Sequence, residues 1–200
     1  MATGMMAIAL LASCGQSPAS PASPSTASTG ASTAAVVATP SATQAPTASA
    51  TADAPAFPAD TTADTAEPSA GAALTVSEAT VGAHEGYDRV VLTLGGTGTP
   101  GWRVEYVDAP VDDPSGQPLD VAGSAYLQVL IDGTGYPYDT GVTEWAGSPL
   151  QPSGLTQVRE VNLRGVFEGQ TQAFIGLDHT APFRVFALTD PTRLVIDVQH

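Results

Sequence analysis

The residues with the most distinctive chemistry in this chain of 200 residues are one cysteine and six arginines. Cys14 is the only thiol, so no disulfide can form within the chain. There is no lysine, so each fixed positive side chain is a planar guanidinium, which can bind a carboxylate through two parallel hydrogen bonds. Twenty acidic residues give a formal net charge of −14, which excludes electrostatic binding to nucleic acid.

Cys14 ends a short apolar segment that is typical of a bacterial lipoprotein signal. The apolar residues 7–12 run into Leu11-Ala12-Ser13-Cys14, with small residues before the cysteine, although no Lys or Arg precedes them. The segment is shorter than the roughly 20 residues of a membrane-spanning helix. We therefore predict a signal peptide over residues 1–14, lipidation of Cys14, and anchoring at the extracytoplasmic face of the cell membrane, where two acyl chains suffice.

Four arginines are candidate ligand-binding residues. Arg89 and Arg193 begin two similar segments, Asp88-Arg89-Val90-Val91-Leu92 and Thr192-Arg193-Leu194-Val195-Ile196. Strand alternation places both on the face opposite the main apolar side chains. One interpretation pairs these arginines with nearby carboxylates, of which Asp88 and Asp197 are the nearest in sequence. The other is that one or more of them form a carboxylate-binding fork with Arg164 and Arg184.

Three aromatic residues, Tyr136, Tyr138 and Trp145, are further candidates. Exposed aromatic rings in a loop can stack on sugar rings, but amphipathic aromatics also cover the open end of a β-sandwich. Both interpretations remain open for this segment.

No residue pattern supports catalysis or a bound cofactor. His84-Glu85 lacks the second histidine that a zinc-binding helix would place three residues after the glutamate. These two residues and the other candidate metal ligands, Asp88, Asp178, His179 and His200, are interpreted as turn and strand-end residues in solvent. The glycine-rich segment 95–101 lacks the Gly-Lys-Ser/Thr ending of a phosphate loop, and no Gly-x-Ser-x-Gly motif occurs. We expect a protein that is not an enzyme, with no catalytic residue, metal or cofactor.

The elements that position these residues are predicted to be β-strands. Residues 15–73, almost wholly Ala, Ser, Thr and Pro, are predicted to form a disordered linker, and residues 74–200 to form one domain. The composition of the chain is also typical of a high-GC genome, which favours an actinobacterial source. Apolar segments separated by Gly and Pro turns predict an all-β, antiparallel sandwich. The expected strands are Leu74–Val81, Arg89–Leu94, Trp102–Val107, Leu119–Ile131, Leu155–Leu163, Thr171–Leu177, Phe183–Leu188 and Arg193–Val198, with a short helix or ordered loop in Tyr136–Pro152.

Two segments of this domain resemble a known family. His84-Glu85-Gly86-Tyr87-Asp88-Arg89-Val90-Val91, together with Pro182–Phe186 and the closing residues Asp190–Val198, is similar to the AMIN-like domain of actinobacterial lipoproteins. The related AMIN domain is a β-sandwich that targets cell-wall amidases and pilus secretins to peptidoglycan. The resemblance therefore implies envelope binding rather than chemistry. For the alternative in which the arginines form a fork, the expected ligands are the free carboxylates of peptidoglycan stem peptides.

Two function hypotheses follow. The first is a lipid-anchored, non-catalytic envelope protein whose domain binds peptidoglycan. The second is an envelope assembly or scaffold protein that contacts another protein through its β-domain, by an exposed sheet edge.

Overall fold

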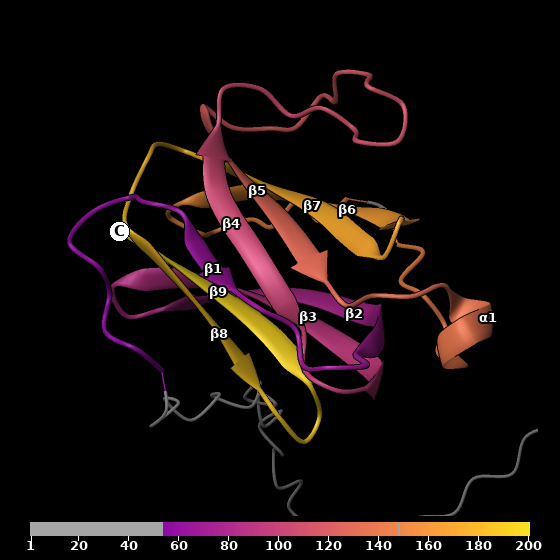
Figure 1. Ribbon diagram of the computed structural model, residues 1–200. Helices are drawn as coiled ribbons and strands as arrows, with labels where there is room; N and C mark the ends of the chain where they lie inside the picture. The colour runs from indigo at the N-terminus through magenta and orange to yellow at the C-terminus, as the bar shows by residue number, and fades with distance from the viewer. Residues whose placement is uncertain (1–53, 148) are drawn as a thin grey trace, which may run out of the picture. The chain divides into compact units, whose positions relative to one another are not determined.

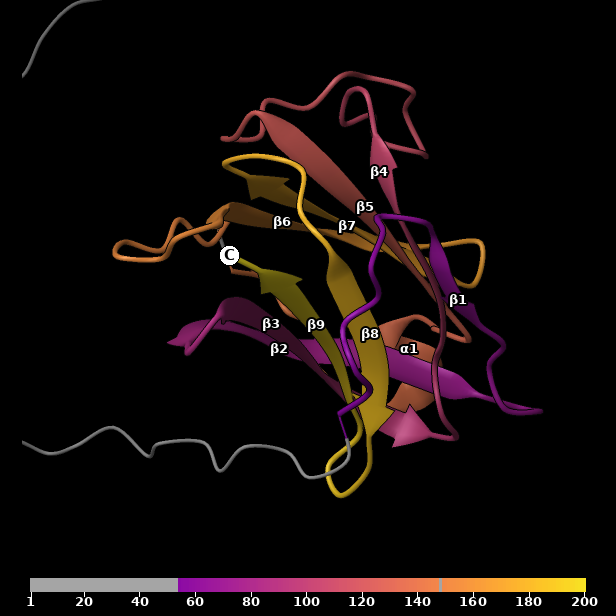
Figure 2. The ribbon, with the colours of Figure 1, turned by 90° about the vertical axis from the view of Figure 1, so that its left-hand side faces the viewer.

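The computed structural model describes residues 54–147 and 149–200, so Cys14 and residues 15–53 of the predicted linker lie outside the described residues. The described chain forms two antiparallel sheets packed face to face (Figures 1 and 2). The predicted all-β antiparallel sandwich is confirmed. No helix in the described part of the chain is long and apolar enough to cross a membrane.

The first sheet has the strand order β1-β4-β5-β7-β6. Its strands are β1 (Asp64–Ala66), β4 (Gly101–Val107), β5 (Ala125–Asp132), β6 (Val158–Phe167) and β7 (Gln170–Leu177). Strand alternation sends one set of side chains into the sandwich and the other set, which includes Arg164, to the outer face.

The second sheet has the order β2-β3-β9-β8. Its strands are β2 (Ala73–His84), β3 (Tyr87–Thr97), β8 (Phe183–Leu188) and β9 (Arg193–Gln199). Strands β3 and β9 pair over their length, with Val90 opposite Ile196 and Arg89 opposite Asp197.

The core lies between the two sheets and consists of the inward-facing aliphatic side chains. Val90, Leu92 and Leu94 of β3 are at most 3% exposed, as the alternation in this strand predicts. They pack against side chains of β5 and β7 in the same buried cluster. A fully buried core of this kind supplies most of the stabilisation of a small β-domain, since each large aliphatic side chain contributes about 1.5–3 kcal/mol.

The structure corrects two of the sequence predictions for this domain. The predicted linker over residues 15–73 is wrong in its last part, because β1 pairs with β4 and Phe57 contacts the ring of Tyr87. The predicted strand Leu119–Ile131 is wrong in its first part, because β5 begins only at Ala125. The apolar residue Val121 is instead buried as part of a loop.

Two connections cover surfaces that the sheets leave open. The segment between β5 and β6 contains the four-residue helix α1 (Pro137–Thr140), which confirms the expectation of a short helix or ordered loop. The long connection between β4 and β5 folds over the outer face of the first sheet (Figure 1). We call residues 108–124 of this connection the β4–β5 loop.

Candidate functional site

The site begins with an irregularity in β6. The register of β6 against β7 shifts between Leu163 and Val166. Leu163 pairs with Ala173 and Val166 with Thr171, so β6 has one more residue than β7 in this interval. This is a β-bulge, which bends a strand and changes the direction of the side chains beside it. The bulge carries Arg164, and it brings this side chain against the β4–β5 loop.

The β4–β5 loop is held on the sheet by two polar side chains of its outer face. The amide of Gln172 accepts a hydrogen bond from the backbone N–H of Asp113 (3.2 Å) and donates one to the carbonyl of Val111 (3.1 Å). Further along the loop, the buried carboxylate of Glu160 accepts a hydrogen bond from the N–H of Ala122 (3.2 Å). The loop is therefore fixed at both ends, although it contains no regular secondary structure.

A pocket of about 430 Å³ remains where the β4–β5 loop meets the end of the β6–β7 hairpin. We call it the Arg164 pocket. It is lined by Asp112, Asp113, Pro114, Leu130, Arg164, Gly165, Val166, Phe167, Glu168, Gln170 and Gln172. Its volume is within the range of about 300–1,000 Å³ that is usual for small-molecule sites.

The protein uses Nε of the Arg164 guanidinium, and the Arg164 side chain lines the pocket. Its Nε donates a hydrogen bond to Oδ1 of Asp112 at 2.9 Å, and Oδ2 of Asp112 accepts one from the Ser115 hydroxyl at 2.6 Å. The hydrogen bonds from Ser115 and then Arg164 lower the pKa of Asp112 below its ordinary value, so Asp112 stays ionised and keeps Arg164 in place. Within the described residues, neither terminal nitrogen of Arg164 has a hydrogen-bond partner.

The remaining walls of the pocket combine carboxylates with an apolar surface. Asp113 and Glu168 are both exposed, and within the described chain neither side chain has a hydrogen bond or ion pair. Phe167 is 41% exposed and lines the pocket together with the apolar side chain of Leu130. The arrangement offers a guanidinium, two free carboxylates and an aromatic face to one ligand.

The structure does not bring the four candidate arginines together. Arg89 and Arg184 lie on the outer face of the second sheet and share the fully buried carboxylate of Asp197. Arg193 lies at the start of β9 and donates from Nε to the carbonyl of Pro191 at 3.2 Å. Of the four, Arg164 lies on the outer face of the first sheet, whereas Arg184 lies on the second sheet, so the predicted fork that combines Arg164 with Arg184 is wrong.

Arg89 and Arg184 have a structural role at Asp197. Arg89 binds Asp197 through Nε at 2.6 Å and Nη2 at 2.9 Å, and the hydrogen bond raises the pKa of Arg89. Arg184 donates from Nη1 to the carbonyl of Pro55 at 2.6 Å, and its guanidinium lies 4.1 Å from the ring centroid of Phe57. These contacts bind the segment before β1 to the second sheet, where Figure 2 shows it crossing β8.

The sequence interpretation of these ion pairs was half right. Asp197 is a partner of Arg89, as expected, but Asp88 is not. Asp88 faces inward and is fully buried; its Oδ2 accepts hydrogen bonds from the backbone N–H groups of Gln157 (2.6 Å) and Val158 (3.0 Å), and its Oδ1 contacts His200 (3.1 Å). Asp88 therefore joins β3 to the start of β6, across the two sheets, and the expectation that it lies in solvent is wrong.

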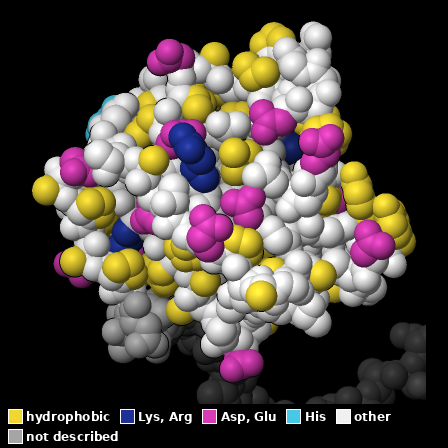
Figure 3. Space-filling view, viewed as in Figure 1, with side chains coloured by type: hydrophobic (Ala, Val, Ile, Leu, Met, Phe, Trp, Pro, Cys, Tyr) yellow, Lys and Arg dark blue, Asp and Glu magenta, His cyan; other side chains and the backbone are white. Residues whose placement is uncertain are grey.

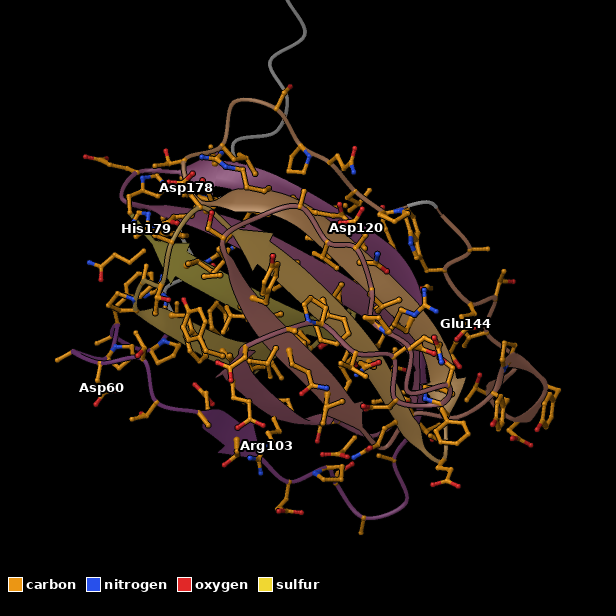
Figure 4. The ribbon with its side chains drawn as sticks, turned by 90° about the horizontal axis from the view of Figure 1, so that it is seen from above. Asp60, Arg103, Asp120, Glu144, Asp178 and His179 are labelled. Carbon is orange, nitrogen blue, oxygen red and sulfur yellow. The ribbon has the colours of Figure 1, made fainter. Side chains whose placement is uncertain are left out.

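The histidines and the nearby carboxylates are spread over the domain. Asp178 and His179 lie together at one end of the molecule, whereas Glu144 lies at the other end (Figure 4). His84 stacks on Tyr87, with ring centroids 4.9 Å apart. In residues 54–147 and 149–200, no group of three His, Cys, Asp or Glu residues could hold a metal ion.

The three aromatic candidates separate into two kinds. Trp145 is partly buried against the core, and its backbone N–H bonds to the carbonyl of Val76 at 2.8 Å, so it covers the sandwich. Tyr136 and Tyr138 are exposed, the latter by 80%, and their rings are stacked at 5.3 Å. Phe167 is the exposed aromatic residue that sequence reasoning missed, and its only sequence signal is its position just before the Glu168-Gly169 turn.

The surface shows how isolated the positive charges are. In Figure 3 the arginine atoms appear as separate spots between acidic and uncharged side chains, with no continuous basic area. A polyanion would be repelled by such a surface, so an anionic group can bind only at a local site.

Comparison with known families gives one match. Residues 74–200, more than half of the chain, match the model of the AMIN-like domain. This confirms the family resemblance of the segments around His84 and at the end of the chain. No curated protein and no solved structure matches the chain.

Proposed function

Because the chain belongs to the AMIN-like domain family, which suggests a peptidoglycan-related envelope domain, we propose that its β-sandwich is a non-catalytic module that binds cell-wall peptidoglycan at the Arg164 pocket. The observation that carries this proposal is the guanidinium of Arg164, which lines a pocket beside an exposed aromatic ring and whose two terminal nitrogens have no hydrogen-bond partner within the described residues.

The proposed ligand fits both features of the pocket. Peptidoglycan stem peptides carry free carboxylates, which a guanidinium binds bidentately, and hydrogen bonds to charged groups contribute about 1.5–3 kcal/mol each. The ring of Phe167 can pack against a sugar ring or an aliphatic side chain of the same ligand. The net charge of −14 opposes an anionic polymer, so binding at the single pocket is weak.

Anchoring is the second part of the proposal. We infer that Cys14, outside the described residues, carries a diacylglyceryl group and holds the chain at the extracytoplasmic face of the cell membrane. Residues 15–53 then join the lipid to the domain. The apolar segment before Cys14 and the absence of any other cysteine support this inference.

Replacing the cysteine tests the anchor. Cys14→Ser should leave the protein without lipid and move it from the membrane fraction to the soluble fraction, because two acyl chains provide stable attachment. Membrane fractionation and mass analysis of the mature N-terminus check this expectation. An unmodified Cys14 in the cell-associated wild-type protein would contradict it.

Binding is tested by co-sedimentation with purified cell-wall sacculi. Arg164→Ala should lower the bound fraction strongly, because it removes the only guanidinium of the pocket. Arg193→Ala is the matched control, since Arg193 also uses only Nε in the described part of the chain but lies outside the pocket. Both variants should melt close to the wild type. Equal sedimentation of Arg164→Ala and wild type would contradict the proposal.

A specific observation also favours the second hypothesis, contact with another envelope protein. The N–H and C=O groups of Ala79, Val81 and Ala83 point away from β3, and within the described chain no backbone group binds the edge of β2 beyond Val76. A hollow of about 340 Å³, lined by Ala79, Thr80, Val81, Leu150, Gln151 and Pro152, lies beside this edge. An extended segment of a partner could pair with the free edge as an added strand.

Cross-linking distinguishes this second candidate. A photoreactive residue in place of the exposed Thr80 should capture one defined partner in cells, whereas the same residue in place of the exposed Glu168 should not. If position 80 gives no cross-linked product, the edge of β2 does not bind a partner, and the second candidate function is contradicted.

A further inference from the structure

The charge balance of the Arg164 pocket indicates which part of a stem peptide it recognises. One guanidinium and three carboxylates, those of Asp112, Asp113 and Glu168, line the pocket. We propose that the pocket binds the zwitterionic end of a diamino-dicarboxylic acid side chain, in which one carbon carries both a free ammonium and a free carboxylate. This inference rests on the proposed function and specifies its ligand.

The guanidinium provides the site for the carboxylate. Asp112 binds Nε of Arg164, and within the described residues both terminal nitrogens lack a hydrogen-bond partner, so they can donate the two parallel hydrogen bonds that a second carboxylate accepts. The side chain of Arg164 is 36% exposed and that of Asp112 is 10% exposed, so a ligand reaches the guanidinium while the pair beneath it stays protected.

The two carboxylates at the rim provide the site for the ammonium. Asp113 and Glu168 approach the pocket from the β4–β5 loop and from the β6–β7 turn, so an ammonium bound between them would join the two walls. An ammonium group has three N–H donors and can bind both carboxylates together. A ligand that carried only a carboxylate would leave these two negative charges uncompensated, and their repulsion would oppose its binding.

The apolar wall fits the chain that connects this end group to the rest of the peptide. Phe167, Leu130 and Pro114 line the pocket beside the charged groups. The methylene groups of a diamino-dicarboxylic acid can pack on them, which removes apolar surface from water. A lysine side chain has similar methylene groups and an ammonium but no terminal carboxylate, so it would not engage Arg164.

The test compares three soluble tripeptides that differ only at this end group. Calorimetry on the full chain uses three peptides. The first is L-Ala–γ-D-Glu–diaminopimelate, and the second is the same peptide with the side-chain carboxylate beside the free ammonium amidated. The third has lysine in place of diaminopimelate. The first should bind at least about tenfold more tightly than the other two. In Arg164→Ala the three should bind equally weakly, whereas Arg193→Ala should keep the wild-type order.

A second variant tests the ammonium site. Glu168→Gln keeps the size of the side chain and removes its charge, so it should weaken binding of the diaminopimelate peptide severalfold. Wild-type affinities that are equal for the three peptides, or no measurable binding of any of them, would overturn the inference. If sacculus binding still depends on Arg164 in that case, the proposed function stands and only the zwitterionic ligand is wrong. If sacculus binding is independent of Arg164, the proposed function and the zwitterionic ligand are both wrong.

Discussion

The function of each arginine in this domain follows from which of its nitrogen atoms the protein itself uses. Arg103 is bound to Glu105 through Nε and Nη2, and Arg159 donates from both terminal nitrogens to backbone carbonyls and Asp178. Arg184 is similarly engaged at Asp197 and Pro55. Arg164 differs because, within the described residues, only its Nε has a hydrogen-bond partner and its side chain lines a pocket.

Arg164→Lys separates charge from geometry at this position. A lysine keeps the positive charge but offers a single ammonium, which cannot bind Asp112 and a ligand carboxylate in the same bidentate arrangement. We expect the variant to fold as the wild type and to lose most of its sacculus binding, by about tenfold or more in affinity. Retention of wild-type affinity would show that charge alone is recognised.

Asp197 provides the contrasting case of a structural carboxylate. Its side chain is fully buried, and those of Arg89 and Arg184 are 8% and 13% exposed. Asp197→Ala removes the carboxylate that both guanidiniums share, and breaking a buried pair in this way costs about 3–5 kcal/mol. Denaturant unfolding should show this loss, whereas Glu105→Ala, at an exposed pair, should change little; a loss at Asp197 that is no larger than the one at Glu105 would contradict the structural role.

At the scale of the elements, a bulge and a loop create the pocket. An isolated antiparallel bridge between Val111 and Pro118 and backbone hydrogen bonds within the loop give it a local shape. Side chains of the sheet below hold it in place. Gln172 binds the loop backbone on both sides, at Val111 and at Asp113. The position of Arg164 depends on the same loop through Asp112.

Gln172→Ala should loosen the β4–β5 loop. The change removes two hydrogen bonds between side chain and backbone, which cost about 0.5–1.5 kcal/mol each. Hydrogen exchange should become faster in residues 111–119 while exchange in β3 and β9 stays slow, and ligand affinity should fall. Unchanged exchange in the loop would mean that other contacts, such as those of Glu160, hold it alone.

The strands could be predicted from the sequence, but the pocket could not. Alternation in β3 and β9 placed Arg89 on the outer face, and the register confirms Asp197 as its neighbour there. The contact between Arg164 and Asp112 joins residues 52 positions apart and depends on a bulge that no local pattern announces. The failure at residues 119–124 has a similar cause, because Val121 is buried as part of a loop and not within a strand.

At the scale of the whole molecule, the domain begins earlier than composition indicates. The residues before Ala73 contain few large apolar side chains, yet Asp64 accepts hydrogen bonds from Trp102 (2.9 Å) and from the backbone of Val185 (3.3 Å). These bonds connect the edges of the two sheets. Hydrogen bonds between Asp64 and strands far away in the sequence leave no periodic pattern of apolar residues. The predicted linker therefore extended too far toward the C-terminus.

Truncation measures this contribution. A chain that begins at Ala72 should remain all-β by circular dichroism, because both sheets keep their central strands. It should be less stable than a chain that begins at Ala54 by roughly 1–3 kcal/mol, since it loses β1 and the hydrogen bonds of Asp64. Equal stability of the two chains would show that residues 54–71 add nothing to the fold.

The most direct test of the central claim is to locate bound peptidoglycan on the domain. Soluble muropeptides from digested cell wall, titrated into the ¹⁵N-labelled chain, should shift the backbone resonances of Leu130, Arg164, Phe167 and Gln170 together, with one common affinity. The same titration of Arg164→Ala should leave these resonances unshifted. Shifts confined to the free edge of β2, or to Tyr136 and Tyr138, would contradict the Arg164 pocket as the binding site.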